Sequence, residues 1–484
     1  MRELAYLGAG EALESFRRLE LSPLEVLEAQ IAEIEARNGD TTTGINALTE
    51  TLFDSARTSA RRAADLYARC ASDGTTPPAL LGLTVATKEK HGIAGRRLEY
   101  GLAARRGQLA SDDHPVVERI TAAGGIIHAR TTSPEFSCAT VTHSPMWGVT
   151  RNPWDLRTSP GGSSGGAGAA LAAGFTTLAT ASDIAGSTRI PAGFTGTVGY
   201  KAPFGRIPGL PPLAADWYRG DGPMGRTVAD VELLSSVMSG QHPIDHCSRG
   251  PSGHRLDLDA GVAGLRIGLC LRLGDYPVAP EIVENTRAAA DALAAAGADV
   301  VEVDLPWTTD LIRETIFAHF GHILGPAVAR EIAGTEEQTA AYLRQFIADT
   351  AAAAQRYSLI DSMAMDARVQ GELAAGMAGV DVLVCPTSAV TSLRADGDYL
   401  DGIDTPGRRL THYWEAHLTA PFNVANACPV LSIPSGMADG IPTGVQVVGH
   451  PNDEAMVFRV AQAVESKVSA TRPARPGTLR VGPE

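Results

Sequence analysis

Lys88 is one of only four lysines in a chain that carries most of its positive charge on arginine. It lies near the end of LLGLTVATKEK (residues 80–90), whose short, apolar and β-branched pattern predicts a buried strand. Burial disfavours the charged form of lysine, whereas arginine stays protonated in proteins. A general base that works near neutral pH would therefore be Lys88. The alternative is a strand-end lysine that reaches solvent, with Lys90 as its neighbour.

A loop rich in glycine and serine, SPGGSSGG, holds Ser163 and Ser164. Glycine allows a close approach of the backbone to a ligand, and the alanine-rich run that follows predicts a helix and argues against a flexible linker. A phosphate cradle is a second function for such a loop, although the GxxxxGK[ST] and GxGxxG spacings are absent. The loop also satisfies G-x-S-x-G, which would make Ser164 the nucleophile of a hydrolase elbow.

A third candidate is the segment SDIAGSTR around Ser187. Small residues precede the serine, so successive backbone N–H groups can converge on one point and form an oxyanion hole. The alternative is an ordinary turn between strands in which Asp183 and Arg189 form a local ion pair.

Together and in this order, these segments resemble the amidase signature family of hydrolases. The likeness runs from about residue 22 to 465, and it is carried by LTVATKEK, TRNPWD, SPGGSSGGAGAALAAG, SDIAGSTRIPA, GYKAPFGRIP, GPMGRTVADVELL and residues 419–449. The resemblance implies an α/β fold, with a central mixed β-sheet flanked by helices on both faces.

The resemblance also implies roles for single residues. Lys88 matches the family's base, Ser163 matches a relay serine that follows a cis peptide bond, and Ser187 matches the nucleophile. The two serines are 187 − 163 = 24 residues apart, as in the family pattern. The oxyanion hole falls on the N–H groups of Ile184, Ala185, Gly186 and Ser187, and the residues that brace this loop are Asp183 and Arg189.

The implied reaction is hydrolysis of a C–N bond in small or synthetic amides or carbamates, through an acyl-enzyme on Ser187 and with no metal or organic cofactor. Ala185 stands where most members have glycine, which resembles the branch that hydrolyses cyclic nylon oligomers and some urethane-cleaving members. Urethanase activity on aryl carbamates is therefore one alternative. An amidotransferase subunit that generates ammonia in a complex is another, and Ile190, where those subunits usually have glutamine, speaks against it. A non-catalytic binding protein is disfavoured because all three catalytic positions are intact.

Two segments are candidates for the substrate pocket. Residues 207–223 are rich in turn-forming residues and predict a mobile lid, with Trp217 and Tyr218 as pocket residues. Residues 309–376 predict a helical wall, to which His319 would contribute. Both segments are rich in apolar residues, which favours an apolar or aryl substrate.

The elements that must position these residues follow from periodicity and capping. Residues 1–70 predict N-terminal helices, one of which starts at Ser22-Pro23 and stops at Asn38-Gly39, and another of which spans residues 49–69. Residues 80–240 predict the catalytic core, with short strands and turns at 177–200. The polar stretch 240–262 is interpreted as an internal loop, so that residues 1–484 form a single domain.

The composition excludes several function classes. A formal net charge of −14 and a pI of about 5.4 disfavour nucleic acid as a partner. No uncharged apolar run reaches the ~18 residues of a membrane helix, and no signal-peptide pattern begins the chain. The six cysteines lack CxxC spacing, and Pro243 separates His242 from His246, so no metal site is predicted. We expect a cytoplasmic enzyme, monomeric or homodimeric, that binds a small-molecule amide, ester or carbamate and associates with no membrane.

Overall fold

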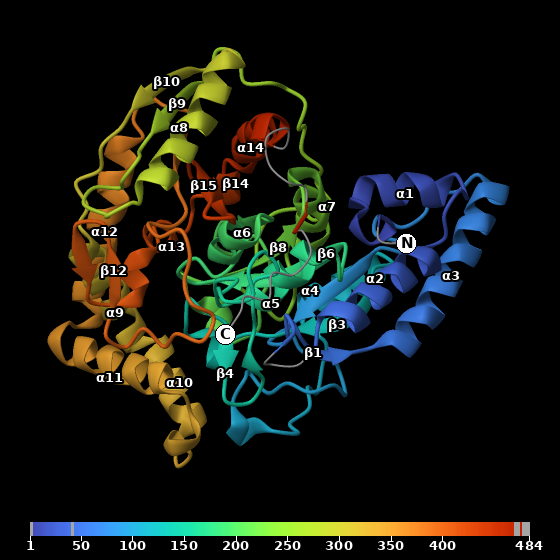
Figure 1. The fold of residues 1–484 in the computed structure, drawn as a ribbon, viewed down its shortest axis with the longest axis horizontal. Helices are drawn as coiled ribbons and strands as arrows, with labels where there is room; N and C mark the ends of the chain where they lie inside the picture. Colours follow the sequence, from blue (N-terminus) through green and yellow to red (C-terminus); the bar gives the residue numbers. More distant parts are fainter. Residues whose placement is uncertain (1–2, 40–42, 469–474, 477–484) are drawn as a thin grey trace.

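A mixed β-sheet of eleven strands runs through the computed structural model, which describes residues 3–39, 43–468 and 475–476 (Figure 1). Strand β2 is parallel to both of its neighbours, β3 and β6, whereas β6, β8, β7, β14, β15 and β11 pair antiparallel in turn. The predicted α/β class with a mixed sheet is confirmed. In spatial order the strands are β1 (Leu48–Thr51), β3 (Ile126–Thr131), β2 (Thr84–Lys88), β6 (Leu178–Asp183), β8 (Gly220–Gly225), β7 (Val198–Lys201), β14 (Val430–Ala438), β15 (Ile441–Gly449), β11 (Val382–Pro386), β9 (Arg266–Leu269) and β10 (Asp299–Glu302).

Helices cover both faces of the sheet. Because side chains alternate along a strand, Val382 and Val384 face one apolar core while Leu383 and Cys385 face another. The helices that contribute to the core of Val382 and Val384 include α4 (Pro115–Ala122), α7 (Val228–Met238), α8 (Pro280–Ala295) and α14 (Glu454–Val468). Two shorter helices, α5 (Gly165–Ala172) and α6 (Arg189–Thr195), pack on the opposite face.

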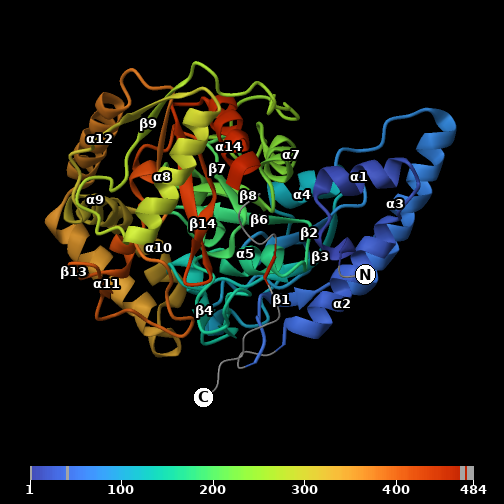
Figure 2. The ribbon, with the colours of Figure 1, turned by 45° about the horizontal axis from the view of Figure 1, so that its top comes forward.

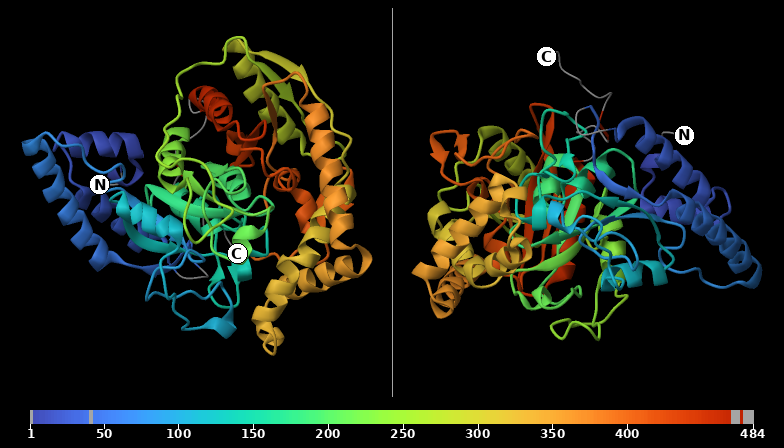
Figure 3. Two further views of the ribbon diagram at one scale, coloured as in Figure 1. Left: turned by 180° about the vertical axis from the view of Figure 1, so that it is seen from behind. Right: turned by 90° about the horizontal axis from the view of Figure 1, so that it is seen from below.

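Two further groups of helices lie on opposite sides of the molecule (Figures 1, 2 and 3). The N-terminal group consists of α1 (Ala9–Arg17), α2 (Pro23–Arg37) and α3 (Phe53–Asp73). The other group consists of α9 (Thr309–His322), α10 (Leu324–Ile332), α11 (Ala341–Arg356) and α12 (Leu359–Gly376). Helical structure is thus confirmed for both regions. A capping box of Ser22 and Glu25 starts α2, and α2 ends just before Asn38, as predicted.

Two local predictions were wrong. The helix expected at residues 49–69 begins only at Phe53, because Leu48–Thr51 forms edge strand β1 against β3. The segment 177–200 contains α6 in addition to strands. Proline and glycine give RIPAGFT a poor intrinsic helix propensity, but all seven residues are buried, so tertiary packing selects this conformation.

The other segments of the chain connect these layers or form short elements. The polar stretch 240–262 connects α7 to β9, which both belong to the layers of the eleven-stranded sheet. No helix within the described ranges is long and apolar enough to cross a membrane. The short elements are β4 (His143–Ser144), β5 (Gly148–Val149), β12 (Ile403–Thr405), β13 (Arg408–Leu410) and α13 (Pro421–Val424).

Helix α5 begins directly after the Gly/Ser loop, and its packing generates a first prediction. A Cβ atom added at Gly166 would lie 2.4 Å from Thr132 Oγ1 and 2.6 Å from Thr132 N, so Gly166→Ala must displace α5 from β3. We expect a loss of about 1–3 kcal/mol in the free energy of unfolding, measured with urea. Gly10→Ala is the control, because nothing lies within 4 Å of its added Cβ in α1. An equal loss in both variants would contradict the packing explanation.

Candidate active site

Strand β2 carries the Lys88 side chain into the interior of the protein. All five residues of β2 are buried, and Lys88 has no solvent exposure. Its Nζ lies 2.7 Å from Ser163 Oγ, 2.9 Å from Ser164 Oγ and 3.1 Å from Ser182 Oγ. Three hydroxyl groups from two segments therefore converge on one amine.

The surroundings of Lys88 favour its neutral form. Ser164 Oγ donates to the carbonyl of Ser182 over 3.4 Å, so it accepts from Lys88. All three contacts of Nζ are with neutral hydroxyl oxygens, and no carboxylate in the described part of the chain contacts it. Burial, followed by the nearby charge of Lys90, lowers the pKa of Lys88 well below its usual value. These surroundings give Lys88 the properties of a base.

The Gly/Ser loop is closely packed against neighbouring backbone. The peptide bond between Gly162 and Ser163 is cis, as the family resemblance implied. A Cβ atom at Gly162 would lie 2.5 Å from the carbonyl oxygen of Val141, so glycine is required there. Ser163 and Ser164 are fully buried. The alternative of a flexible linker is therefore wrong.

Ser187 and Ser163 line the same small cavity of about 20 Å³. Ser187 is 8% exposed, and its carbonyl oxygen accepts a hydrogen bond of 3.1 Å from the N–H of Ser164. That bond ties the two serine loops together. Ser164 is not among the residues that line this cavity, and its hydroxyl is engaged with Lys88 and Ser182. The geometry favours Ser187 over Ser164 as the attacking group.

The Asp183 carboxylate and the Arg189 guanidinium form a buried ion pair beneath the Ser187 loop. Arg189 reaches both carboxylate oxygens, at 3.0 and 2.9 Å, and Asp183 also accepts the N–H groups of Gly186 (2.8 Å) and Thr188 (3.1 Å). Burial by itself would raise the pKa of Asp183, but the charge and hydrogen bonds of Arg189 hold it at about 2. The same guanidinium also binds Thr419 O, Gln446 Oε1 and Asn423 Oδ1.

One of the four N–H groups expected in the oxyanion hole is already bound. Gly186 donates its N–H to Asp183, and its φ of 122° is accessible only to glycine. A Cβ atom at this position would lie 2.0 Å from Thr419 Oγ1. The N–H groups of Ile184, Ala185 and Ser187 remain the predicted donors.

A second buried network surrounds Asp221 in β8. Lys90 Nζ lies 2.9 Å and His91 Nε2 3.0 Å from Asp221 Oδ1, and His114 Nε2 lies 3.4 Å from Oδ2. The two histidines and the aspartate have the spacing of metal ligands. However, the N–H of Val116 donates to His114 Nδ1, which places the ring proton on Nε2, and Lys90 already neutralises the carboxylate. This donor set fits a hydrogen-bonded ion pair better than a metal site.

The predicted pocket residues Trp217, Tyr218 and His319 come together, but as a packed cluster. The rings of Tyr218 and His319 stack with centroids 3.6 Å apart, and both residues are fully buried. Trp217 and Tyr218 donate to Asp366, and His319 Nε2 lies 2.7 Å from Asp216. Their polar atoms bind the carboxylates of Asp366 and Asp216, and none of the three residues lines the cavity at Ser187, so they anchor the 216–218 segment to α9 and α12.

The proposed lid and the helical wall contribute to a second cavity of about 270 Å³. Residues 210–213 of the predicted lid segment line this cavity. Residues 220–223 belong to central strand β8 and therefore cannot be part of a lid. Helix α10 supplies Ala327, Arg330 and Glu331 to this cavity and Leu324 to the cavity at Ser187. Part of the 309–376 region thus forms a wall beside the site.

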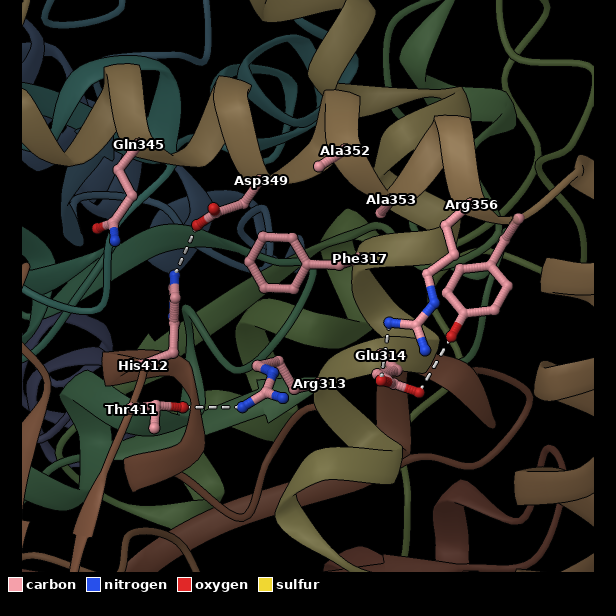
Figure 4. A pocket seen from close by; sticks show the side chains of 11 residues that line it. Arg313, Glu314, Phe317, Gln345, Asp349, Ala352, Ala353, Arg356, Thr411 and His412 are labelled. Carbon is pink, nitrogen blue, oxygen red and sulfur yellow. Dashed lines mark hydrogen bonds and ion pairs between the residues drawn. The ribbon is translucent and has the colours of Figure 1, made fainter.

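A larger cavity, of about 410 Å³, lies between α9 and α11 (Figure 4). None of the residues named so far for catalysis lines it. Two ion pairs lie in its walls, with Arg356 at 3.3 Å from Glu314 and His412 at 3.4 Å from Asp349.

Several residues of the site were not found from the sequence. Thr180 and Ser182 lie two positions apart on β6, so their side chains lie on the same face of the sheet. Thr180 Oγ1 accepts the Lys88 N–H, and Ser182 Oγ accepts from the Lys88 amine. Their spacing was a usable signal, because short strands were predicted within residues 177–200. Asp221 and Arg219 had no such signal, since only the pairing of β8 with β6 brings them to the site.

A buried lysine that meets two serine loops on a mixed sheet defines a class of α/β hydrolases, the amidase signature enzymes. The chain belongs to this family, because the family model described as Amidase matches residues 25–458. The protein is therefore an amidase-signature hydrolase that acts on C–N amide bonds.

Individual relatives agree with this assignment. A 6-aminohexanoate-cyclic-dimer hydrolase from Paenarthrobacter ureafaciens is 33% identical over 481 residues, which cover 93% of each chain. One glutamyl-tRNA(Gln) amidotransferase subunit, from Synechococcus sp. (strain CC9605), is 31% identical and covers 94% of this chain and 95% of its own. The solved structure of a bacterial aryl acylamidase is similar, with a TM-score of 0.85, 26% identity, and coverage of 97% of this chain and 99% of that chain.

The brace under Ser187 generates a second prediction. Arg189→Met leaves the Asp183 carboxylate buried without its cation, so we expect a loss of about 3–5 kcal/mol in the free energy of unfolding, measured with urea. Arg157→Met is the control, because the 76% exposed Arg157 side chain pairs with Asp155 at the surface. We expect a far smaller loss there, and similar losses in the two variants would contradict the role of the buried pair.

Proposed function

We propose that the protein hydrolyses the C–N bond of small amides through an acyl-enzyme on Ser187, with Ser163 as proton relay and Lys88 as base. The observation that carries this proposal is the contact of 2.7 Å between the fully buried Lys88 amine and Ser163 Oγ, at a cavity that Ser163 shares with Ser187.

The proposed reaction begins with two linked proton transfers. Neutral Lys88 accepts the proton of Ser163 while Ser163 accepts that of Ser187, and the Ser187 oxygen attacks the amide carbonyl. The N–H groups of Ile184, Ala185 and Ser187 stabilise the oxyanion of the tetrahedral intermediate. The relay then returns the proton to the leaving amine, and water hydrolyses the ester formed on Ser187.

Two relatives support small amides as substrates, since they are named as hydrolases of a cyclic amide dimer and of aryl acylamides. Carbamates are a second candidate, because they undergo the same acyl transfer and because Ala185 resembles urethane-cleaving members of the family. The relative from the amidotransferase supports ammonia production in a complex as a third candidate. The apolar Ile190, buried against the Gly/Ser loop, speaks against it.

Removing the three proposed groups one at a time tests the assignment. We expect Ser187→Ala, Ser163→Ala and Lys88→Ala each to lower kcat by several orders of magnitude, with at least about 10⁴-fold for Ser187→Ala. The assay is release of chromophore from p-nitroanilides, p-nitrophenyl esters and aryl carbamates. A phosphonyl fluoride should label Ser187, as read by peptide mass spectrometry.

Ser164→Ala is the matched control for these variants, since Ser164 also contacts Lys88. We expect it to keep labelling at Ser187. If Ser164→Ala abolishes labelling and turnover while Ser187→Ala retains them, the nucleophile is Ser164 and the proposal is wrong.

The pH dependence of kcat/KM follows from the state of Lys88. Only the neutral amine accepts a proton, so kcat/KM should rise with pH through the lowered pKa of Lys88 and then level off. Lys88→Arg should be inactive at every pH, because a guanidinium stays protonated. The exposed Lys467 offers the control Lys467→Arg, which should leave the profile unchanged. A measurable plateau of kcat/KM at high pH in Lys88→Arg would contradict the role of Lys88 as the base.

A further inference from the structure

The cavity at Ser187 adjoins a larger cavity, the one of about 270 Å³ lined by α10 and residues 210–213. Three residues line both cavities: Phe136, Ser137 and Arg219. A substrate whose carbonyl lies at Ser187 and whose chain extends into the larger cavity therefore passes Arg219.

The larger cavity carries an excess of positive charge in a chain whose formal net charge is −14. Two carboxylates face four cationic side chains there. The carboxylates are Asp221 and Glu331, and the cations are Lys90, Arg105, Arg219 and Arg330.

Both carboxylates are already engaged. Asp221 accepts from Lys90 and lies against two histidines, and Glu331 pairs with Arg105. Two arginines remain. Of these, Arg330 on α10 is exposed and lines only the larger cavity, whereas Arg219 is half-buried and reaches the cavity at Ser187 as well.

The backbone of Arg219 is held firmly, while its guanidinium has no partner in the described part of the chain. Its N–H donates to Asp216 O over 3.0 Å, and its carbonyl accepts from Asn426 Nδ2 over 3.4 Å. No ion pair, side-chain hydrogen bond or ring contact within the described ranges involves its guanidinium. A partly desolvated cation without a counterion gains free energy when an anion binds beside it.

We propose that Arg219 binds a carboxylate of the substrate, so that the preferred substrates are amides that carry a carboxylate within reach of Ser187. The guanidinium offers two parallel N–H groups that match the geometry of a carboxylate. The apolar side chains of Tyr100, Phe136 and Leu213 in the same cavity suit the spacer between the amide and the carboxylate. This inference rests on the proposed function, and it narrows that function to an anionic substrate class.

Two matched substrate pairs test the proposal on either side of the scissile bond. On the acyl side, the mono-p-nitroanilide of glutaric acid is compared with pentanoyl p-nitroanilide. On the amine side, N-pentanoyl-4-aminobenzoate is compared with N-pentanoylaniline. In at least one pair, we expect kcat/KM to be about 10- to 100-fold higher for the substrate that carries the carboxylate. A hydrogen bond between charged groups contributes a binding free energy that corresponds to this ratio. The absence of a preference in both pairs would overturn the proposal.

Variants of Arg219 and Arg330 show which residue causes the preference for a carboxylate. Arg219→Gln should abolish the preference, and Arg219→Lys should restore part of it, because the positive charge returns without the two parallel N–H groups. Arg330→Gln removes the same charge from the same cavity, so it is the control and should keep the preference. If Arg330→Gln abolishes the preference and Arg219→Gln keeps it, Arg219 is not the binding residue.

A binding measurement separates failure of this proposal from failure of the proposed function. If the wild type cleaves none of the four amides, amide hydrolysis of this kind is wrong, and calorimetry with glutarate and benzoate still reports on Arg219. We expect Arg219→Gln to weaken carboxylate binding by about tenfold or more. The thermal midpoint of the variant is compared with that of the wild type to show that the variant is folded. Equal binding by wild type and Arg219→Gln would overturn the proposal.

Discussion

Burial of the Lys88 amine is the constraint on which the rest of the site depends. Burial of an amine without a counterion favours loss of its proton, and the three hydrogen-bond partners of its Nζ are neutral hydroxyl oxygens. The neighbouring Lys90 has its own carboxylate in Asp221, so that carboxylate does not contact Lys88. Two lysines on one short segment thus have different partners, and only Lys88 faces the serines.

The serine loops reach Lys88 because distant segments hold them in place. Arg189 joins the Ser187 loop to residues 419–446, and Thr419 Oγ1 donates to the carbonyl of Ala185 over 2.6 Å. The glycines of the other loop allow contact with residues 139–142 at distances that a side chain would prevent. The proposed catalytic groups are therefore placed by the C-terminal half of the chain as much as by their own motifs.

The walls around this centre explain how one machinery can serve different substrates. The contacts between Lys88 and the serines lie in buried elements, whereas α10 and residues 210–213, outside the central sheet, form part of the wall of the adjoining cavity. Changes in these segments alter the charge and shape of the cavity without touching the base or the proposed nucleophile. The cationic character of the cavity is a property of this chain's own side chains, in particular of Arg219.

The sequence by itself determined the sheet-and-helix architecture, the buried strand that ends at Lys88, and the loops around Ser163 and Ser187, because burial patterns, caps and glycine-rich turns are local signals. It could not determine α6, whose residues have poor helix propensity, or edge strand β1, which exists only through pairing with β3. It also misplaced Trp217, Tyr218 and His319, since their aromatic character does not show which way they face. Only the tertiary structure brought Ser182, Asp221 and Arg219 to the site, because strand pairing joins residues that are far apart along the chain.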